Sequence, residues 1–456
     1  MQSRLKKILV VAAAQAAFVG AGVASGQTTA PFTYTSTGDG SDWTQAAAWT
    51  CTDADGRPCS GQPDYPQDSA HIVVIADEIF LDTTVTIASM EITGAGLLSV
   101  DCGAEVLVGS DLTVKSGGML NIYGDLVVKQ DMFIDAHSNV PAERGQAWVQ
   151  GACAFLEVEG ELWILGYLEV YGDGASEAVV DVHQRVTIEA RNTPGSIEGE
   201  AVVGNAEGHG RLYVRENLTI QATPGWAEFG ELNVIAGAAV LTMENTVDPQ
   251  HPVGGDINLE SDVSILLVLD DAELVAYHDG VNEIPGEIRG MDDDASVQIA
   301  DGRAWTLGEG MALRGALAVA PESGSATFIN LGIVEANSPF GTTLSFAESL
   351  DVTDGDAAPY GLWMTTVEDA TLEFNESLQL NGDFEVTGGG IVRVTGGTPQ
   401  DPNLVLTTGN VTPNPQTNPD GCIKAEEHAC FGWRVDETFP PDQICDDQIG
   451  TNCPSR

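Results

Sequence analysis

The chain has 456 residues, and its 18 Lys and Arg against 68 Asp and Glu give a formal net charge of -50. So negative a surface repels polyanions, which argues against nucleic acid and pectin-like sugars as partners. Solubility and salt tolerance explain much of this acidity, since exposed charges are screened beyond ~8 Å at physiological ionic strength; binding of Ca²⁺ or other cations is the alternative.

Residues 1–26 predict a secretory signal peptide. Three basic residues precede an apolar run from Ile8 to about Val23, and small residues follow at 24–26. This order of a charged, an apolar and a small-residue region is typical of a cleaved Sec-type leader. An uncleaved anchor helix is the alternative, but the run is short and rich in Ala and Gly. We expect a secreted, extracellular or cell-surface protein with no transmembrane segment in the mature chain.

Residues 27–84 form a predicted N-terminal cap that is marked by tryptophan and cysteine. The stretch "GDGSDWTQAAAWTC" contains Trp43 and Trp49, although only 6% of the residues are aromatic. The open end of a stack of strands exposes unpaired backbone groups and needs a cover. We expect the two indole rings to lie over the first strands as an apolar lid.

Eight cysteines in an exported chain predict disulfides. Three pairs share one spacing, which favours local closure of Cys51 with Cys59, Cys422 with Cys430, and Cys445 with Cys453. The remaining Cys102 and Cys153 would join neighbouring turns of the fold. Zinc binding is the competing interpretation, but close Cys-x-x-Cys spacing is absent and export favours oxidation.

Residues 85–407 carry a repeat that predicts a parallel β-helix. Short strands present two apolar residues on either side of one outward residue, so that one face of each strand points inward. The pattern returns three strands later, 22 residues on from Leu98 to Leu120 and 20 from Val106 to Leu126. A period of this size is typical of a solenoid, here of about fifteen coils. The first inward pairs are Leu98/Val100, Val106/Val108, Leu112/Val114, Leu120/Ile122, Leu126/Val128 and Met132/Ile134.

The predicted fold class is therefore all-β, a single-stranded right-handed parallel β-helix with an N-terminal cap. The uneven spacing of six and eight residues between strands favours the right hand. A string of antiparallel β-sandwiches is the rival, but the strands are too short and too evenly spaced for it. Residues 408–421 are a predicted Pro/Asn/Thr-rich linker, and residues 422–456 a small tail held by disulfides rather than by a core.

The opening and the Gly-rich repeats resemble the passenger regions of bacterial exported β-helix proteins, both autotransporter-like adhesins and the large surface proteins of aquatic bacteria. Trp43, Trp49, Pro66 and Asp68 stand where that family has its motif, while Ala48 replaces the usual Asn. The resemblance covers about residues 33–400 and implies a β-helical surface protein. How the chain would be attached stays open between release, periplasmic residence and capture by another surface component.

Candidate catalytic residues lie in the middle of the chain. His209 stands in a Gly-His-Gly step that resembles polygalacturonase-like hydrolases, but the acidic steps that precede this His in that family are missing. Asp270 and Asp271 offer two carboxylates for glycoside cleavage. Adjacent residues of a strand point to opposite faces, however, so both would serve one site only at a bend. The sequence favours a turn histidine and a solvated acidic turn, and we predict no catalytic residue.

Two acidic turns are weak candidates for Ca²⁺. Asp53 and Asp55 form half of an EF-hand-like loop in "DADGR", and "DVTDGD" supplies Asp351, Asp354 and Asp356. Neither turn has the full series of ligands that ends in a bidentate Glu. We therefore expect no required cofactor, and Ca²⁺ as the one cation that would bind weakly.

These observations predict a secreted or cell-surface, non-catalytic β-helical protein of structural or adhesive kind. Its side wall would contact glycans, surface proteins or further copies of the chain. The alternative is a carbohydrate-active β-helix enzyme, a polysaccharide hydrolase or lyase with a cleft in residues 192–290. Carboxylates converging from adjacent coils would favour the enzyme, whereas a smooth wall with scattered acids would favour the structural protein.

Overall fold

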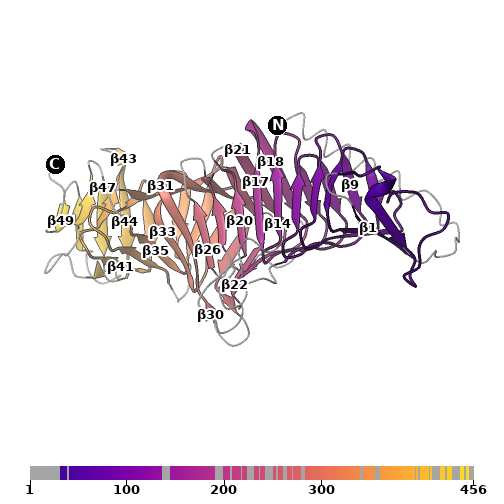
Figure 1. Cartoon of the computed structure of the whole chain (residues 1–456). Coiled ribbons are helices and arrows are strands. Elements are labelled where there is room, and N and C mark those ends of the chain that lie inside the picture. The colour runs from indigo at the N-terminus through magenta and orange to yellow at the C-terminus, as the bar shows by residue number, and fades with distance from the viewer. Residues whose placement is uncertain are drawn as a thin grey trace.

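The computed structural model shows a long rod built almost entirely of strands (Figure 1). Outside the short 3-10 turn η1 (Ala46–Ala48), each regular element in the described part is a strand. No helix in that part is long and apolar enough to cross a membrane. The residues described are 31–37, 41–135, 144–190, 199–205, 208–216, 218–222, 231–235, 237–241, 250–252, 255–259, 264–269, 271–278, 283–338, 342–354, 360–395, 397–398, 401–409, 411–412, 422–426, 429–433, 442–445 and 448–450.

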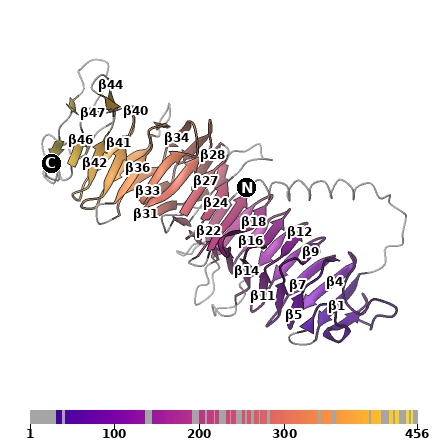
Figure 2. The ribbon, with the colours of Figure 1, turned by 90° about the horizontal axis from the view of Figure 1, so that it is seen from above.

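Three consecutive strands make one coil, and equivalent strands of successive coils pair in parallel. The rod therefore has three side faces, and its strands lie across the long axis (Figure 2). Face 1 contains β1 (Phe32–Ser36), β4 (His71–Ile75), β7 (Ser89–Ile92), β10 (Leu112–Val114), β13 (Met132–Ile134), β16 (Leu162–Ile164), β19 (Val186–Ala190), β22 (Leu218–Ala222), β25 (Gln250–Pro252), β28 (Ala272–Val275), β32 (Ala304–Leu307), β34 (Ala326–Asn330), β37 (Leu350–Thr353), β40 (Leu378–Leu380), β44 (Asp401–Thr407) and β47 (Ala429–Trp433).

Faces 2 and 3 continue each coil and share two long strands, β31 (Gly286–Ile299) and β33 (Met311–Pro321), which turn the corner between them. Face 2 also contains β2 (Ser41–Asp42), β5 (Glu78–Leu81), β8 (Leu97–Val100), β11 (Met119–Ile122), β14 (Gln146–Gln150), β17 (Tyr167–Tyr171), β20 (Glu200–Val203), β23 (Glu231–Val234), β26 (Gly255–Leu259), β35 (Ile333–Ala336), β38 (Leu362–Thr365), β41 (Asp383–Val386) and β45 (Val411–Thr412). Face 3 also contains β6 (Val85–Ile87), β9 (Glu105–Val108), β12 (Asp125–Val128), β15 (Phe155–Val158), β18 (Gly174–Val182), β21 (Gly208–Val214), β24 (Gly237–Leu241), β27 (Ser264–Val268), β36 (Thr343–Phe346), β39 (Thr371–Phe374), β42 (Ile391–Val394) and β46 (Cys422–Ala425).

The register confirms the predicted period. Leu98 lies opposite Leu120 on the next coil, and Val106 lies opposite Leu126. The residues of the predicted inward pairs are fully buried in the core. Parallel pairing throughout the stack rules out the antiparallel sandwiches. Right-handed coiling stays a prediction; it is the sense that crossovers between parallel strands nearly always take.

The stack extends past the predicted bounds of 85 and 407. β1 already pairs in parallel with β4, and at the other end β42 pairs with β46 and β44 with β47. These end strands have too little regular alternation to be recognised in the sequence, and they join the stack because their backbone groups need partners. The last strands pair antiparallel: β46 with β49 (Gln448–Gly450) and β47 with β48 (Asp442–Cys445).

The N-terminal end is covered as the sequence predicts. β3 (Trp49–Thr52) pairs antiparallel with β1, and the Trp43 and Trp49 rings meet edge to face at 4.9 Å between centroids. The Trp43 indole N–H donates to the Pro66 carbonyl at 2.8 Å, and that of Trp49 to the Trp43 carbonyl at 2.7 Å. Both rings are buried. The lid is thus an apolar pair whose polar atoms are satisfied by the backbone.

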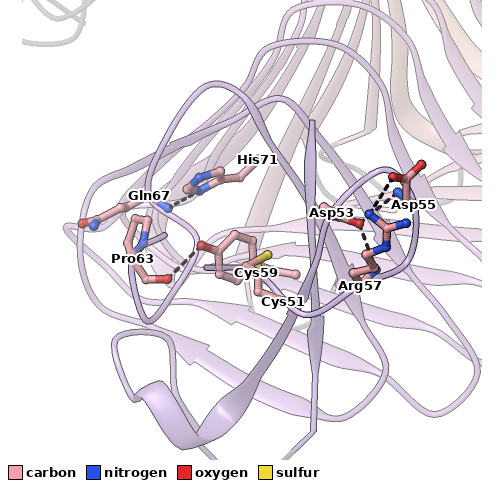
Figure 3. Close-up of a disulfide and its surroundings, with 9 residues drawn as sticks. Cys51, Asp53, Asp55, Arg57, Cys59, Pro63, Gln67 and His71 are labelled. Atoms are coloured by element: carbon pink, nitrogen blue, oxygen red, sulfur yellow. Dashed lines mark hydrogen bonds and ion pairs between the residues drawn. A yellow bond between two sulfur atoms is a disulfide. The ribbon is translucent and has the colours of Figure 1, made fainter. Parts of the chain in front are cut away.

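Two disulfides brace the N-terminal half. Cys51 is joined to Cys59 as predicted, in the loop shown in Figure 3. Cys102 is joined to Cys153, but these cysteines lie in the β8–β9 and β14–β15 turns, two coils apart rather than on neighbouring ones. The intervening β11–β12 turn is only two residues long, Tyr123 and Gly124, so it leaves room for the bridge to pass.

The described C-terminal cysteines lie on three different strands: Cys422 on β46, Cys430 on β47 and Cys445 on β48. Cys422 and Cys430 are both disulfide-bonded, which removes the zinc interpretation for them. The antiparallel register places Cys430 opposite Cys445, whereas the sequence spacing predicts Cys430 with Cys422. Cys453 lies outside the described residues, and its pairing with Cys445 stays a prediction.

Candidate functional site

A shallow hollow of about 280 Å³ opens on the outer side of face 2. It spans β8, β11, β14 and β17, which are successive neighbours in one parallel sheet. Figure 1 shows β14 and β17 side by side in this part of the rod. We call this hollow the aromatic groove and define it by its lining residues, which are Leu97, Met119, Asn121, Trp148, Gln150 and Tyr171.

Strand alternation aims these side chains outward. In β14 the burial alternates along "QAWVQ", with Ala147 and Val149 buried and Trp148 half-buried between them. Backbone pairing then places Asn121 beside Trp148, and Gln150 beside Tyr171. Side chains at paired positions of adjacent parallel strands form a row, and within a row neighbouring side chains are about 4.8 Å apart. The groove is therefore built from three rows that run along the rod.

The aromatic rings lie where no core needs them. Trp148 meets Tyr167 of the next coil with ring centroids 6.3 Å apart and planes at 61°. Tyr123, in the turn that follows β11, is 38% exposed and borders the groove on the side of face 3. Large apolar rings that stay at the surface of a regular wall point to a contact with something outside the protein.

The polar groups of the groove divide into engaged and free ones. The Tyr171 hydroxyl donates to Gln150 Oε1, and the Gln150 amide nitrogen stays available as a donor at the lining. The Asn121 amide and the Trp148 indole N–H make no hydrogen bond to any part of the chain that the structure describes. These three groups can bond to hydroxyls of a ligand.

Charged side chains flank the groove but pair among themselves. Arg144 lies over the Tyr167 ring at 4.6 Å and bonds to Glu200 at 3.2 Å. Glu169 accepts hydrogen bonds from the Tyr167 hydroxyl at 2.9 Å and from Asn205 Nδ2 at 2.8 Å. Burial, and secondarily the Glu169 carboxylate, raises the pKa of Tyr167. The lining itself has no charge, which is notable in a chain with 68 acidic residues.

The structure places His209, the first candidate catalytic residue, on a strand. It lies half-buried on β21 of face 3, opposite Glu177 of β18. Glu177 in turn bonds to Arg211 at 2.9 Å. The acid that strand pairing sets opposite His209 is therefore already held by a cation. His209 is a strand residue rather than the turn histidine that the sequence favours.

Asp271 acts as a turn residue. Its Oδ1 accepts the backbone N–H of Ala304, one coil further on, at 2.9 Å. It is exposed in the turn between β27 of face 3 and β28 of face 1, whereas His209 lies near the start of β21. Asp270 lies outside the described residues. The structure therefore does not bring His209 and Asp271 together.

The "DADGR" loop uses its own carboxylate (Figure 3). Asp53 Oδ1 accepts the backbone N–H groups of Asp55 and Arg57 at 2.9 and 2.8 Å. The Asp55 carboxylate lies 3.5 Å from the Arg57 guanidinium, with both side chains exposed. The loop is closed by an Asx turn and a surface ion pair.

The second acidic turn is divided between surface and interior. Asp351 is exposed on β37, whereas Asp354 is fully buried and accepts the backbone N–H of Asn381 at 2.7 Å. Burial raises the pKa of Asp354. Asp356 lies outside the described residues. Asp351 and Asp354 are thus not ligands of one site, because they face opposite sides of the wall.

In the described part of the chain, no three His, Cys, Asp or Glu side chains converge as a metal site. Comparison with protein-family models and with curated proteins finds no match to this chain. The groove was not among the sites predicted from the sequence. Its signal was present as outward aromatic residues in "QAWVQ" and "GYLEVY", but only the coil register makes them neighbours.

Proposed function

We propose that the protein is an exported, non-catalytic β-helical protein of structural or adhesive kind, and that it binds glycans on its side wall. The observation that carries this proposal is the aromatic groove, with free amide and indole donors beside half-buried rings. Sugar rings have apolar C–H faces and polar rims. An aromatic floor with a few placed hydrogen-bond donors complements both parts.

The positions of the carboxylates near the groove fit glycan binding without cleavage. Hydrolysis of a glycosidic bond uses two carboxyl groups about 5 to 9.5 Å apart across the scissile bond. The lining of the groove holds no carboxylate, and the nearby Glu169 and Glu200 bond to Tyr167, Asn205 and Arg144. No observation at His209 or Asp271 favours the enzyme alternative.

The test is retention of the purified mature chain on insoluble and gel-embedded polysaccharides, with newly formed reducing or unsaturated ends scored in parallel. We expect retention on at least one glycan and no new ends. New ends from any glycan would overturn the non-catalytic assignment. Absence of retention on every glycan would overturn glycan binding and leave protein partners or self-association for the wall.

Export is tested separately by fractionating cells that express the full chain. We expect a mature form that starts after about residue 26 in the periplasm, the medium or at the cell surface. A full-length form that stays in the cytoplasm would contradict the predicted leader.

A further inference from the structure

We infer that the aromatic groove selects neutral, hydroxyl-rich polysaccharide chains and rejects acidic ones. This inference rests on the proposed glycan binding and specifies its ligand class. The first observation is the contrast between the lining, which has no charged residue, and a chain of formal charge -50. A uronate or sulfate group would meet no cation in the lining and would be repelled by the field around it.

In the part of the chain that the structure describes, the cation beside the groove is already engaged. Arg144 is held by Glu200 at 3.2 Å and by the face of the Tyr167 ring at 4.6 Å. If Arg144 moved to bind an anion, the Glu200 carboxylate would lose its cationic partner beside the Tyr167 ring. An acidic sugar would therefore have to break an existing ion pair before it gained a new one.

A peptide strand is a poor occupant of this face. Peptides commonly add to a sheet through unpaired backbone groups at its edge. β14 pairs with β11 on one side and with β17 on the other, so the floor of the groove is the middle of a sheet. A ligand on this face can therefore contact only side chains, which include aromatic rings and amides.

A second copy of the chain is also disfavoured. Each copy has a formal charge of -50, so two walls in contact would repel each other. In the described part, the large apolar side chains that are more than a third exposed are Tyr123, Met291 and Tyr360, and only Tyr123 borders the groove. That leaves too little continuous apolar area for a stable dimer at this face.

The rows of the groove set the direction of the bound chain. Its lining extends over four successive coils, from Leu97 on β8 to Tyr171 on β17. A linear polysaccharide lying along the rod meets Asn121 and then Trp148 in one row, and Gln150 and then Tyr171 in the next. A chain lying across the rod would meet one strand only. We therefore expect affinity to rise with chain length.

The experiment measures affinity electrophoresis of the mature protein in gels that contain one soluble glycan each. Laminarin, galactomannan and dextran are the neutral probes, and alginate and polygalacturonate are the acidic probes. We expect retardation by at least one neutral glycan, unchanged between low and high salt, and none by the acidic ones. Retardation by the acidic glycans that equals or exceeds that by the neutral ones would overturn the inference while leaving glycan binding intact.

Substitutions place the effect in the groove. We expect Trp148→Ala to weaken binding about tenfold or more, and Asn121→Asp to weaken it as well by adding a negative charge to the lining. Phe133→Ala, which removes an outward ring from face 1, is the matched control and should bind as the unmodified chain does. If Trp148→Ala binds normally and remains folded by circular dichroism, the groove is not the site.

Discussion

Aromatic residues lie on opposite sides of the wall in the two halves of the rod. In the described part of residues 71–299, no Phe, Tyr or Trp is buried, and the interior is filled by Leu, Val, Ile, Met and Ala. From β32 onward the interior holds a continuous stack of rings with neighbouring centroids 4.9 to 6.1 Å apart. These buried rings are Trp305, Phe328, Phe346, Trp363, Phe374, Phe384 and Phe431.

The same three-faced coil therefore accepts two kinds of filling. Stacking needs only apolar volume at the inward positions and continuous backbone pairing between coils. Rings placed inside serve stability, as their complete burial shows. Rings placed outside, such as Trp148 and Tyr171, contribute little to the core and line the aromatic groove. Whether an aromatic side chain points into the core or out of the wall thus distinguishes a structural role from a binding role.

Removing one ring from each half is the strongest test of this comparison. Trp363 is fully buried. Its ring centroid lies 5.6 Å from that of Phe346 and 5.4 Å from that of Phe374. We expect Trp363→Ala to lower the free energy of unfolding by roughly 3 to 5 kcal/mol, because it leaves a cavity in the core. Trp148→Ala should cost about 1 kcal/mol or less. Urea unfolding followed by circular dichroism measures both, and equal losses would break the distinction between the halves.

Removal of the Cys102–Cys153 bridge should have the next largest effect. It closes a loop across 51 positions of sequence and spans the short turn at Tyr123, which borders the groove. We expect the double change Cys102→Ser and Cys153→Ser to cost about 2 to 4 kcal/mol. The same change should weaken glycan retention, because the outer wall of the groove becomes less ordered.

The control for the bridge is the double change Cys51→Ser and Cys59→Ser in the cap. It should also lower the melting temperature, but it should leave glycan retention as in the unmodified chain, because its loop lies outside the groove. If both pairs affected retention equally, a local role for the Cys102–Cys153 bridge would be contradicted.

Exchanging an aliphatic for an aromatic core residue, or the reverse, should change the free energy of unfolding by less. Leu120 is fully buried between Leu98 and Ala147 of adjacent coils. Leu120→Phe should cost about 1 to 3 kcal/mol because the aliphatic interior is overpacked, and Phe374→Leu should cost about 1 kcal/mol. Thermal melts of the two variants make the comparison. A neutral Leu120→Phe would mean that the N-terminal coils have spare volume and that their lack of buried rings is not a packing requirement.

The smallest effect expected is the pH response of the cap. His71 is buried, its Nδ1 accepts the backbone N–H of Gln67 at 3.1 Å, and burial lowers its pKa although Asp68 opposes this (Figure 3). The unfolded chain thus binds the proton more readily than the folded one. His71 stabilisation is full above the unfolded pKa of about 6.5 and is lost as pH falls below it.

The variant that isolates this response is His71→Asn, which keeps an acceptor near the Nδ1 position but does not titrate. Between pH 7.5 and 5.5 we expect the melting temperature of the unmodified chain to fall more than that of the variant. Equal slopes would show that His71 is not the titrating group. His183 on face 3 should not mimic the effect, because its bond to Glu157 raises its pKa and acts in the opposite sense.

Local sequence determined the inward positions, the period and the N-terminal lid. Whether a residue such as Leu98 or Val106 faces the core follows from strand alternation alone, and the recurrence after 20 or 22 residues follows from counting. Both are properties of neighbouring residues, so they could be predicted without knowing the path of the chain. The burial of Trp43 and Trp49 followed because an open stack needs a cover.

Only the tertiary structure decided which outward residues become neighbours. The coil between β11 and β14 is longer than the first ones, so Asn121 meets Trp148 rather than a residue 20 or 22 positions on. Cys102 likewise meets Cys153 across two coils, because the β11–β12 turn between them is only two residues long. Lateral contacts depend on the length of every intervening turn, which alternation does not encode. The aromatic groove is therefore a product of register, whereas the wall that bears it is a product of the sequence pattern.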